Sequence, residues 1–265
     1  MLRLLHLLTA TSVLLGGCVS PGITPSQEEA AKIAAAHVIP MEAPPLTAFS
    51  LSEPPISGAW FRGLETTPVG AGLVVVGSVM LLVQMARMSG HTEEASESLQ
   101  SALDSGGIWM ATVELAGQAC SRLASEGSQV SVDPEVKRLS GVKDRRATLL
   151  MENWMAPIRA WYNYRDPSPG YLAPNWPEGA YVLEVALINY ELISDRLMLQ
   201  VAMKLIDPAD GRLIGRARAA NDSDLAVLGP LDQAFANDAA HFKRVFSKAA
   251  EPLVEECLLS LGLLR

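Results

Sequence analysis

The chain has 265 residues, which is enough for one medium-sized domain with extensions. Its 29 acidic residues outnumber its 21 lysines and arginines, so the formal net charge is −8 at pH 7. Because nucleic-acid binding requires a basic face, an acidic chain of this kind is a poor candidate for a nucleic-acid partner.

The first 17 residues have the pattern of a targeting segment. Arg3 supplies one positive charge, a largely apolar run follows from Leu4 to Leu15, and two glycines end it. The run is shorter than the roughly 20 apolar residues that a membrane-spanning helix needs. The pattern therefore predicts a secretory signal peptide over residues 1–17.

The stretch Leu15-Gly16-Gly17-Cys18 resembles the lipobox of bacterial lipoproteins. The resemblance implies cleavage before Cys18, a diacylglyceryl group on its thiol, and a further acyl chain such as palmitate on the new amine. Two or more buried chains make a lasting membrane anchor. Val19 stands where inner-membrane lipoproteins of enteric bacteria carry aspartate, which implies an outer-membrane protein that faces the periplasm. An ordinary secretory signal with a chance cysteine, or a cytosolic protein with an apolar start, are the alternatives.

Residues 18–55 are expected to form a lipidated tether, a short helix and a proline-rich linker. Ser26 and Glu29 have the spacing of a capping box before an alanine-rich helix that reaches Ala36. Five prolines between Pro40 and Pro55 favour an extended linker or an edge segment rather than a helix. We therefore expect one folded domain over residues 56–265, with a first short strand at 56–63.

A long uncharged run at about residues 69–88 has two interpretations. It contains Gly70, Gly72 and Gly77, and small residues at such spacing allow close helix contacts in a membrane or in a tight core. We favour a helix buried in the domain or between subunits. A membrane-inserted segment is the alternative, and it would make the chain a pore-forming or membrane-inserting lipoprotein.

The middle of the chain is predicted to hold two helices, a strand and an aromatic segment. The first helix ends at Gly106-Gly107 and the second covers residues 108–127, with apolar residues at 3–4 spacing. A strand follows at 128–133. Pro157 argues against an unbroken helix over 150–164. Five aromatic residues lie in or after this segment, and we expect them to pack in the core: Trp154, Trp161, Tyr162, Tyr164 and Trp176. The alternative is a patch that binds sugars or a partner. The apolar residues of the second helix are Val113, Ala116, Cys120 and Leu123.

Residues 181–220 have the clearest pattern, that of an antiparallel three-strand meander. Apolar residues alternate with polar ones over 196–206, which predicts a strand with one exposed face. Alternation places five basic residues on this exposed face: Arg196, Lys204, Arg212, Arg216 and Arg218. We expect the face to be solvated. The alternative is that it docks an acidic partner or anionic lipid. A mostly helical segment follows over 231–264, which Pro252 divides if it breaks the helix.

The pattern as a whole predicts an α/β (α+β) fold. In it, a small antiparallel or mixed sheet with a three-strand C-terminal meander packs against helices, including the C-terminal one. The stretch LMLQVAMKLIDPADGRLIGRARA resembles the strand–turn–strand of a small α/β domain in the curli-export lipoprotein and in the N-terminal part of TolB. The resemblance implies that domain over residues 56–264. This chain departs from it by a Pro/Trp-rich insertion and the apolar run at 69–88, so pore formation is not carried over.

No residue pattern indicates catalysis, a metal site or a bound cofactor, apart from covalent lipid on Cys18. The four histidines do not form a metal-binding pattern, and Ser140 with Lys143 matches S-x-x-K without the further motif that such enzymes carry. Cys120 and Cys257 could form a disulfide in an oxidising periplasm, although two buried free thiols are favoured.

The sequence therefore predicts a non-enzymatic, lipid-anchored envelope protein. We expect it to act as an accessory or assembly component through contacts with an unidentified envelope protein, and it could self-associate. A membrane-inserting lipoprotein and, less favoured, an envelope hydrolase are the alternatives.

Overall fold

The computed structural model describes residues 21–49, 97–145, 150–163, 171, 179–193, 195–221 and 225–264. The signal peptide, the lipobox with Cys18, the expected strand at 56–63 and the apolar run at 69–88 lie outside these residues. The predictions made for them therefore stay predictions.

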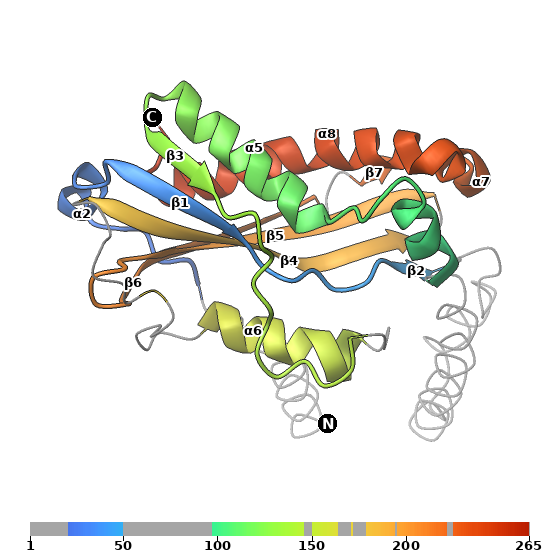
Figure 1. The fold of residues 1–265 in the computed structure, drawn as a ribbon, viewed down its shortest axis with the longest axis horizontal. Coiled ribbons are helices and arrows are strands. Elements are labelled where there is room, and N and C mark those ends of the chain that lie inside the picture. The colour runs from blue at the N-terminus through green and yellow to red at the C-terminus, as the bar shows by residue number, and fades with distance from the viewer. Residues whose placement is uncertain are drawn as a thin grey trace, which may run out of the picture.

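A mixed β-sheet with helices on both faces makes up the described part of the chain (Figure 1). Its elements in chain order are α2 (Gln27–Ala31), β1 (Ala35–Pro40), β2 (Thr47–Phe49), α5 (Ala111–Ser125), β3 (Gln129–Val132), the π-helical turn η1 (Leu150–Met155), α6 (Ala156–Asn163), β4 (Ala180–Ile193), β5 (Arg196–Ile206), β6 (Leu213–Ala220), β7 (Ala226–Val227), α7 (Leu231–Ala234) and α8 (Ala236–Ser260). The strand order is β3-β1-β4-β5-β6, with β2 beside β4 and β7 beside β5. Helices α5 and α8 cover one face, and α6 lies against the other (Figure 1).

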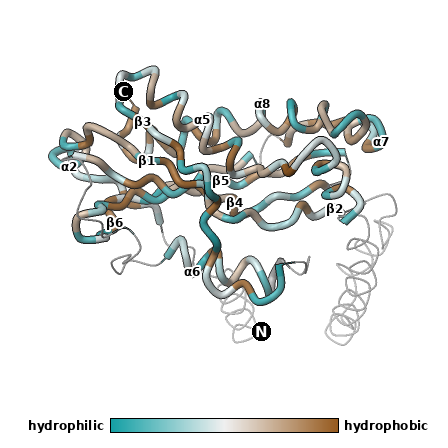
Figure 2. The backbone as a smooth tube through the Cα atoms, viewed as in Figure 1, coloured by the Kyte–Doolittle hydropathy of each residue, from teal (hydrophilic) through white to brown (hydrophobic). Residues whose placement is uncertain are grey.

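The predicted fold class and the C-terminal meander are confirmed. Strands β4, β5 and β6 pair antiparallel in sequence order, while β1 pairs parallel with both β3 and β4. Alternate residues of β5, from Leu197 to Leu205, are buried against the helical layer, as the period of two requires. Hydrophobic residues accordingly gather along the strands of the sheet (Figure 2).

The N-terminal segment belongs to the domain, contrary to the boundary predicted at residue 56. Strand β1 lies inside the sheet between β3 and β4, and β2 pairs with the far end of β4. The helix predicted to reach Ala36 stops at Ala31, because the backbone amides of Ala34 and Ala35 donate to the Gly179 carbonyl and lead into the strand. Available strand partners override the helical preference of an alanine-rich stretch.

Glycines end the two long helices of the outer layer. At the C-terminal end of α5, Gly127 has φ +87°, its amide donates to Ala124, and the Ser128 amide donates to Leu123. These two bonds form a Schellman motif, which confirms the predicted end of this helix. Gly262 ends α8 in the same way.

Pro252 does not divide α8, which runs through it without a break. Its ring lies on the solvent-exposed side of the helix, so water can reach the carbonyl that loses its amide partner. The irregular part of α8 is its beginning, where Asn237, Asp238 and Ala239 have left-handed backbone angles.

The second face of the meander is buried, contrary to the exposed face expected from alternation. Lys204 is 5% and Arg216 1% exposed. Helix α6, the turn η1 and the segment around Leu139 cover this face and form a second apolar cluster with Ala186 and Ala202. The predicted set of basic residues therefore does not form one solvated surface.

Glu184 of β4 is the centre of a buried charged cluster beneath α6. Its carboxylate accepts from the Trp161 indole nitrogen at 2.7 Å and from the Tyr171 hydroxyl, and pairs with Lys137 at 3.3 Å and Lys204 at 3.9 Å. Burial lowers the pKa of Lys204, and the nearby Glu184 carboxylate opposes that shift. The cluster joins β4 and β5 to the residues that cover them.

We predict that Glu184→Ala lowers the free energy of unfolding by about 3 kcal/mol or more, because it leaves the Lys204 ammonium buried without its counter-charge. Urea unfolding measures the change. A Glu184→Leu, Lys204→Met double variant is expected to recover part of the loss, since apolar groups of similar volume can replace a buried ion pair. A Glu184→Ala change within 0.5 kcal/mol of zero would contradict this role.

Candidate functional site

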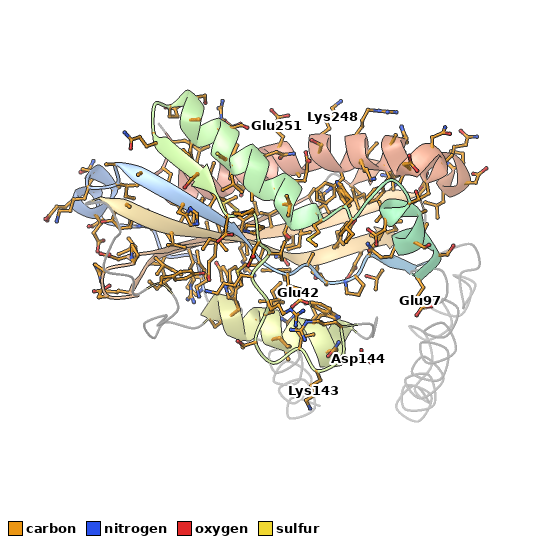
Figure 3. The ribbon with its side chains drawn as sticks, viewed as in Figure 1. Glu42, Glu97, Lys143, Asp144, Lys248 and Glu251 are labelled. Carbon is orange, nitrogen blue, oxygen red and sulfur yellow. The ribbon has the colours of Figure 1, made fainter. Side chains whose placement is uncertain are left out.

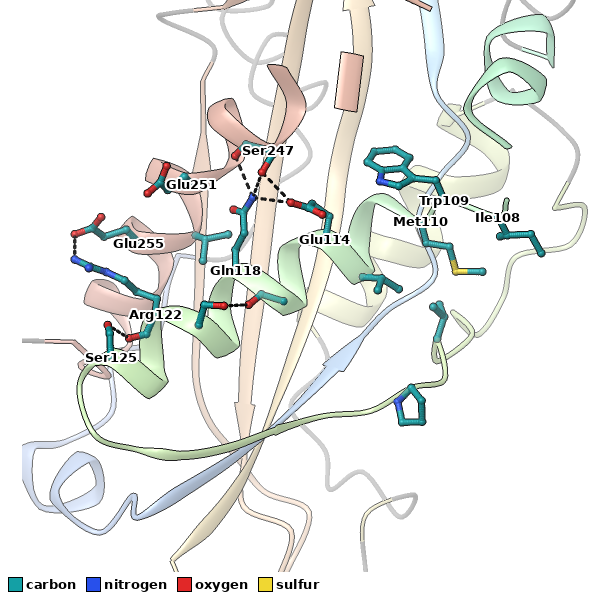
Figure 4. Close-up of a pocket in the computed structure, with 16 residues that line it drawn as sticks. Ile108, Trp109, Met110, Glu114, Gln118, Arg122, Ser125, Ser247, Glu251 and Glu255 are labelled. Carbon is teal, nitrogen blue, oxygen red and sulfur yellow. Dashed lines mark hydrogen bonds and ion pairs between the residues drawn. The ribbon is translucent and has the colours of Figure 1, made fainter. Parts of the chain in front are cut away.

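A groove of about 890 Å³ lies between α5 and α8 on the helical face of the described residues (Figure 4). Its lining comes from the start and exposed side of α5, from the facing side of α8, and from Pro134 and Val136 after β3. The groove exists because both helices rest on the same sheet face and their exposed sides diverge. It lies on the side of the sheet away from α6 (Figure 1).

One end of the groove carries large apolar side chains that face solvent. Ile108 is 81%, Met110 40% and Val113 41% exposed. Between them, Trp109 packs edge-on against Phe246 at 5.2 Å between ring centres, and this contact fixes the strip to α8. Ile108, Trp109 and Met110 also line a second hollow of about 600 Å³, so the strip is a ridge between two depressions. Exposed apolar residues gathered in this way indicate an interaction surface.

Polar bonds join the two helices along the groove floor. The Ser247 hydroxyl donates to Glu114 at 2.8 Å, and the Gln118 amide donates to the Ser247 hydroxyl and carbonyl, both at 3.0 Å (Figure 4). Further along, Arg122 pairs with Glu255 at 2.8 Å. These bonds link α5 to α8, although the buried Oε1 of Gln118 has no partner among the described residues.

The rim of the groove is acidic. Glu251 projects outward from α8 (Figure 3) and makes no ion pair with any of the described residues. Glu114 bonds only to neutral groups there, and the Arg122 cation is neutralised by Glu255. The groove therefore carries the Glu251 and Glu114 carboxylates without a paired cation, while the Lys243 ammonium lies 6.0 Å from the Trp109 ring at the ridge.

The segment that follows Cys18 is fixed to the edge strand β6. The backbones of Ile23 and Arg216 exchange two hydrogen bonds of 2.8 and 2.9 Å, which cover an otherwise open sheet edge. The Arg216 side chain reaches back from the strand and donates from Nε to the Pro21 carbonyl at 3.2 Å. Its Nη1 donates to the Tyr162 carbonyl at the end of α6, at 3.0 Å. We call residues 21–25 on β6 the N-terminal seat.

Glycine makes the N-terminal seat possible. A Cβ on Gly215 would lie 2.9 Å from Pro25 Cδ and from Leu261 Cδ2, and 3.0 Å from the Ile23 carbonyl oxygen. Real side chains essentially never approach so closely, so only glycine lets the segment lie flat on the strand.

An ionised glutamate holds α2 beside the seat. Ser26 and Glu29 form the predicted capping box, which is confirmed, and Arg212 pairs with Glu29 at 3.0 Å. Hydrogen bonds from the Ser26 backbone amide, the Ser26 hydroxyl and Arg212, in that order, lower the pKa of Glu29 to about 2. The helix and its cap thus fix the chain immediately after the seat.

The structure separates the other residues that the sequence singled out. Of the predicted docking face, Lys204 and Arg216 are buried, Arg212 pairs with Glu29, and Arg218 is exposed. Trp154 and Tyr162 pack in the cluster beneath α6, as core packing predicts, and Trp161 bonds to Glu184. Tyr164 and Trp176 lie outside the described residues.

Cys120 and Cys257 are free thiols. Cys257 is fully buried, and burial raises the pKa of its thiol to about 12, which makes it unreactive. Ser140 and Lys143 lie exposed in the loop before η1. Within the described ranges, no group of three or more histidine, cysteine or acidic side chains could hold a metal ion, and no helix is long and apolar enough to cross a membrane.

Sequence reasoning missed both the groove and the seat. The 3–4 spacing grouped Val113 with Ala116, Cys120 and Leu123, whereas in the structure Val113 is exposed and Leu115 and Ala119 share the buried side with Ala116 and Leu123. The only signal for the groove was the run Ile108-Trp109-Met110 directly before a helix. The seat had none beyond Gly215 in a strand.

No protein-family model and no curated protein matches this chain. Among solved structures, it is similar to a PelC dodecamer from Paraburkholderia phytofirmans, with 12% identity, 93% of this chain and 95% of that chain covered, and a TM-score of 0.34. A second PelC dodecamer from the same organism, a single-substitution variant, gives 13% identity, 91% and 95% coverage, and a TM-score of 0.32. Superpositions of this quality transfer neither function nor assembly to this chain.

We predict opposite effects of the same substitution at two glycines. Gly215→Ala should lower the free energy of unfolding by about 1–3 kcal/mol, because the new methyl group collides with the seat and with Leu261. Gly117→Ala, on α5, is the matched control: its Cβ meets nothing within 4 Å, and alanine favours the helix by about 0.5–1 kcal/mol. Chemical denaturation measures both, and a neutral Gly215→Ala would refute the close approach.

We predict that the Glu29 carboxyl titrates at about pH 2, followed by carbon NMR of its side chain. Because its folded pKa lies below the ordinary 4.5, the ionised group stabilises the α2 cap above about pH 4.5 and loses this effect as the pH falls through about 2. Ser26→Ala, which removes only the hydroxyl bond, and Arg212→Ala, which removes both a hydrogen bond and a charge, should each raise this pKa. An unshifted pKa near 4.5 in the unsubstituted chain would rule out the cap.

Proposed function

We propose that this chain is a lipid-anchored protein of the bacterial envelope that faces the periplasm and acts as an accessory component by docking a partner protein on the ridge and groove of α5 and α8. The observation that carries the docking is the exposed apolar strip at the groove mouth, Ile108, Met110 and Val113. The lipobox-like stretch ending at Cys18 supports the location.

The chemistry of the groove selects one kind of occupant. Its apolar strip fits a partner helix with hydrophobic residues at positions i, i+3 and i+4, which is a common way to fill a groove between two helices. Glu251 on the rim and Glu114 on the floor, neither of which forms an ion pair with a described residue, favour lysine or arginine beside those residues. We therefore propose an amphipathic, basic segment of an envelope protein as the partner.

The proposed role is that of a binding module. Hydrogen bonds among Gln118, Ser247 and Glu114 hold α5 on α8. Such a floor keeps the groove shape constant, and a preformed surface loses little conformational freedom when a partner binds.

Site-specific photocrosslinking in cells tests the docking surface. A photoreactive residue at Met110 should join a partner segment that is apolar and rich in lysine or arginine, as identified by mass spectrometry of the joined peptide. Val113→Glu and Glu251→Lys should each reduce this product by about tenfold, which corresponds to the loss of about 1.4 kcal/mol of binding.

Val227 supplies the matched control, since it is exposed (57%) and apolar but belongs to β7. Val227→Glu should leave the product unchanged. The proposed docking fails if Val227→Glu and Val113→Glu weaken the product equally, or if the joined segment is acidic. A product made of two copies of this chain would replace the proposed partner by self-association.

A further inference from the structure

The N-terminal seat determines which side of the domain faces the membrane. Ile23 pairs with Arg216, and the Pro21 carbonyl accepts from the buried Arg216 side chain, so the chain is fixed from residue 21 onward. Cys18 lies only three residues earlier in the sequence. Three residues of extended chain span at most about 11 Å. A lipid on Cys18 therefore places the seat within about 11 Å of the membrane surface.

The seat lies at the free edge of the sheet, near Leu261 at the end of α8, and the side-chain bonds that hold it come from the side that carries α6. Arg216 donates to Pro21 and to the Tyr162 carbonyl, so the seat and the C-terminal end of α6 lie together. Helices α5 and α8, with the groove, lie on the opposite face of the sheet (Figure 1). An anchor at the seat thus turns the α6 side toward lipid and leaves the groove directed away from it.

Arg218 is an exposed cation beside the seat that has no ion pair among the described residues. Arg218 follows Arg216 by two residues on β6, so it shares the same strand face about 7 Å further along, and its side chain is exposed. The other two arginines of this region already have partners. Arg216 donates to two carbonyls, and Arg212 forms an ion pair with Glu29. Arg218 is therefore the arginine of β6 available to an anionic phosphate.

We propose that the mature protein rests on the membrane through a surface formed by the N-terminal seat, the end of α6 and Arg218, and that this surface contacts the headgroups of anionic phospholipids. The proposal rests on the lipid anchor in the proposed function. It replaces the flexible tether expected from the sequence by a short link that holds the domain in one orientation.

Fluorescence quenching in vesicles tests the orientation. The lipidated protein, with Cys120→Ser to remove the half-buried thiol, carries a fluorophore either at Ala160→Cys on α6 or at Lys248→Cys on α8; both positions are exposed. The vesicles consist of phosphatidylethanolamine and phosphatidylglycerol, with a spin label on part of the headgroups. The expected result is strong quenching at residue 160 and little at residue 248.

Two further variants separate orientation from anchoring. Inserting about 12 Gly/Ser residues between Ser20 and Pro21 adds about 20 Å of flexible reach, so the difference between the two positions should collapse while the protein stays vesicle-bound. Arg218→Glu should reduce quenching at residue 160 by about twofold or more. The same charge reversal at Arg196, about 20 Å along the neighbouring strand, should not.

Equal quenching at residues 160 and 248 in vesicle-bound protein with the native link would overturn the orientation and leave the lipid anchor intact. A secreted chain that does not remain with the vesicles, and whose mass shows Cys18 without lipid, would overturn the anchor and the orientation together.

Discussion

The buried guanidinium of Arg216 is the interaction on which the arrangement of this protein depends. It is 1% exposed, and it donates to carbonyls of Pro21 and Tyr162, which come from two distant parts of the chain. Removing a charge of this kind from water costs several kcal/mol, which only well-placed acceptors offset. Because Pro21 is one of those acceptors, the N-terminal seat is part of the fold. The same side chain fixes the end of α6 on the sheet, and its ring contact with Tyr162, at 5.1 Å, adds to this attachment.

The two faces of the sheet consequently differ in chemistry and in role. The face under α5 and α8 is a continuous apolar core, and its outer surface presents the ridge and groove. The face under α6 contains the Glu184 cluster and Arg216, so charged groups that would otherwise face water hold the covering layer in place. Under the proposed lipid anchor, the first face is directed toward partners and the second toward the membrane. The proposed anchor is linked rigidly to the sheet because the N-terminal seat pairs with the free edge of β6.

The sequence predicted those parts of the fold whose residue pattern has one physical meaning. Large apolar residues at every second position from Leu197 to Leu205, followed by a turn at Asp207–Gly211, favour a hairpin, and the meander is confirmed. Alternation does not show what covers the second face, however. Lys204 and Arg216 were predicted to be exposed because lysine and arginine side chains usually are, and because their partners Glu184 and Tyr162 are distant in the sequence.

Strand β1 and the groove were missed for related reasons. The residues from Ala35 to Pro40 carry no period of two, since a strand between two parallel neighbours is buried on both sides, and the proline at its end suggested a linker. The exposure of Val113 was not predicted, because 3–4 spacing identifies a helix without fixing which of its apolar residues face the sheet.

Hydrogen exchange of the Ile23 backbone amide, in the mature protein that begins at Cys18, tests the central claim most directly. This amide donates to the Arg216 carbonyl across the edge of the sheet. The account predicts that it exchanges as slowly as amides within β5 and β6, which open only in larger unfolding events. Exchange at the rate of an unstructured peptide would show that the segment after Cys18 is a free tether, and the fixed orientation of the domain would be wrong.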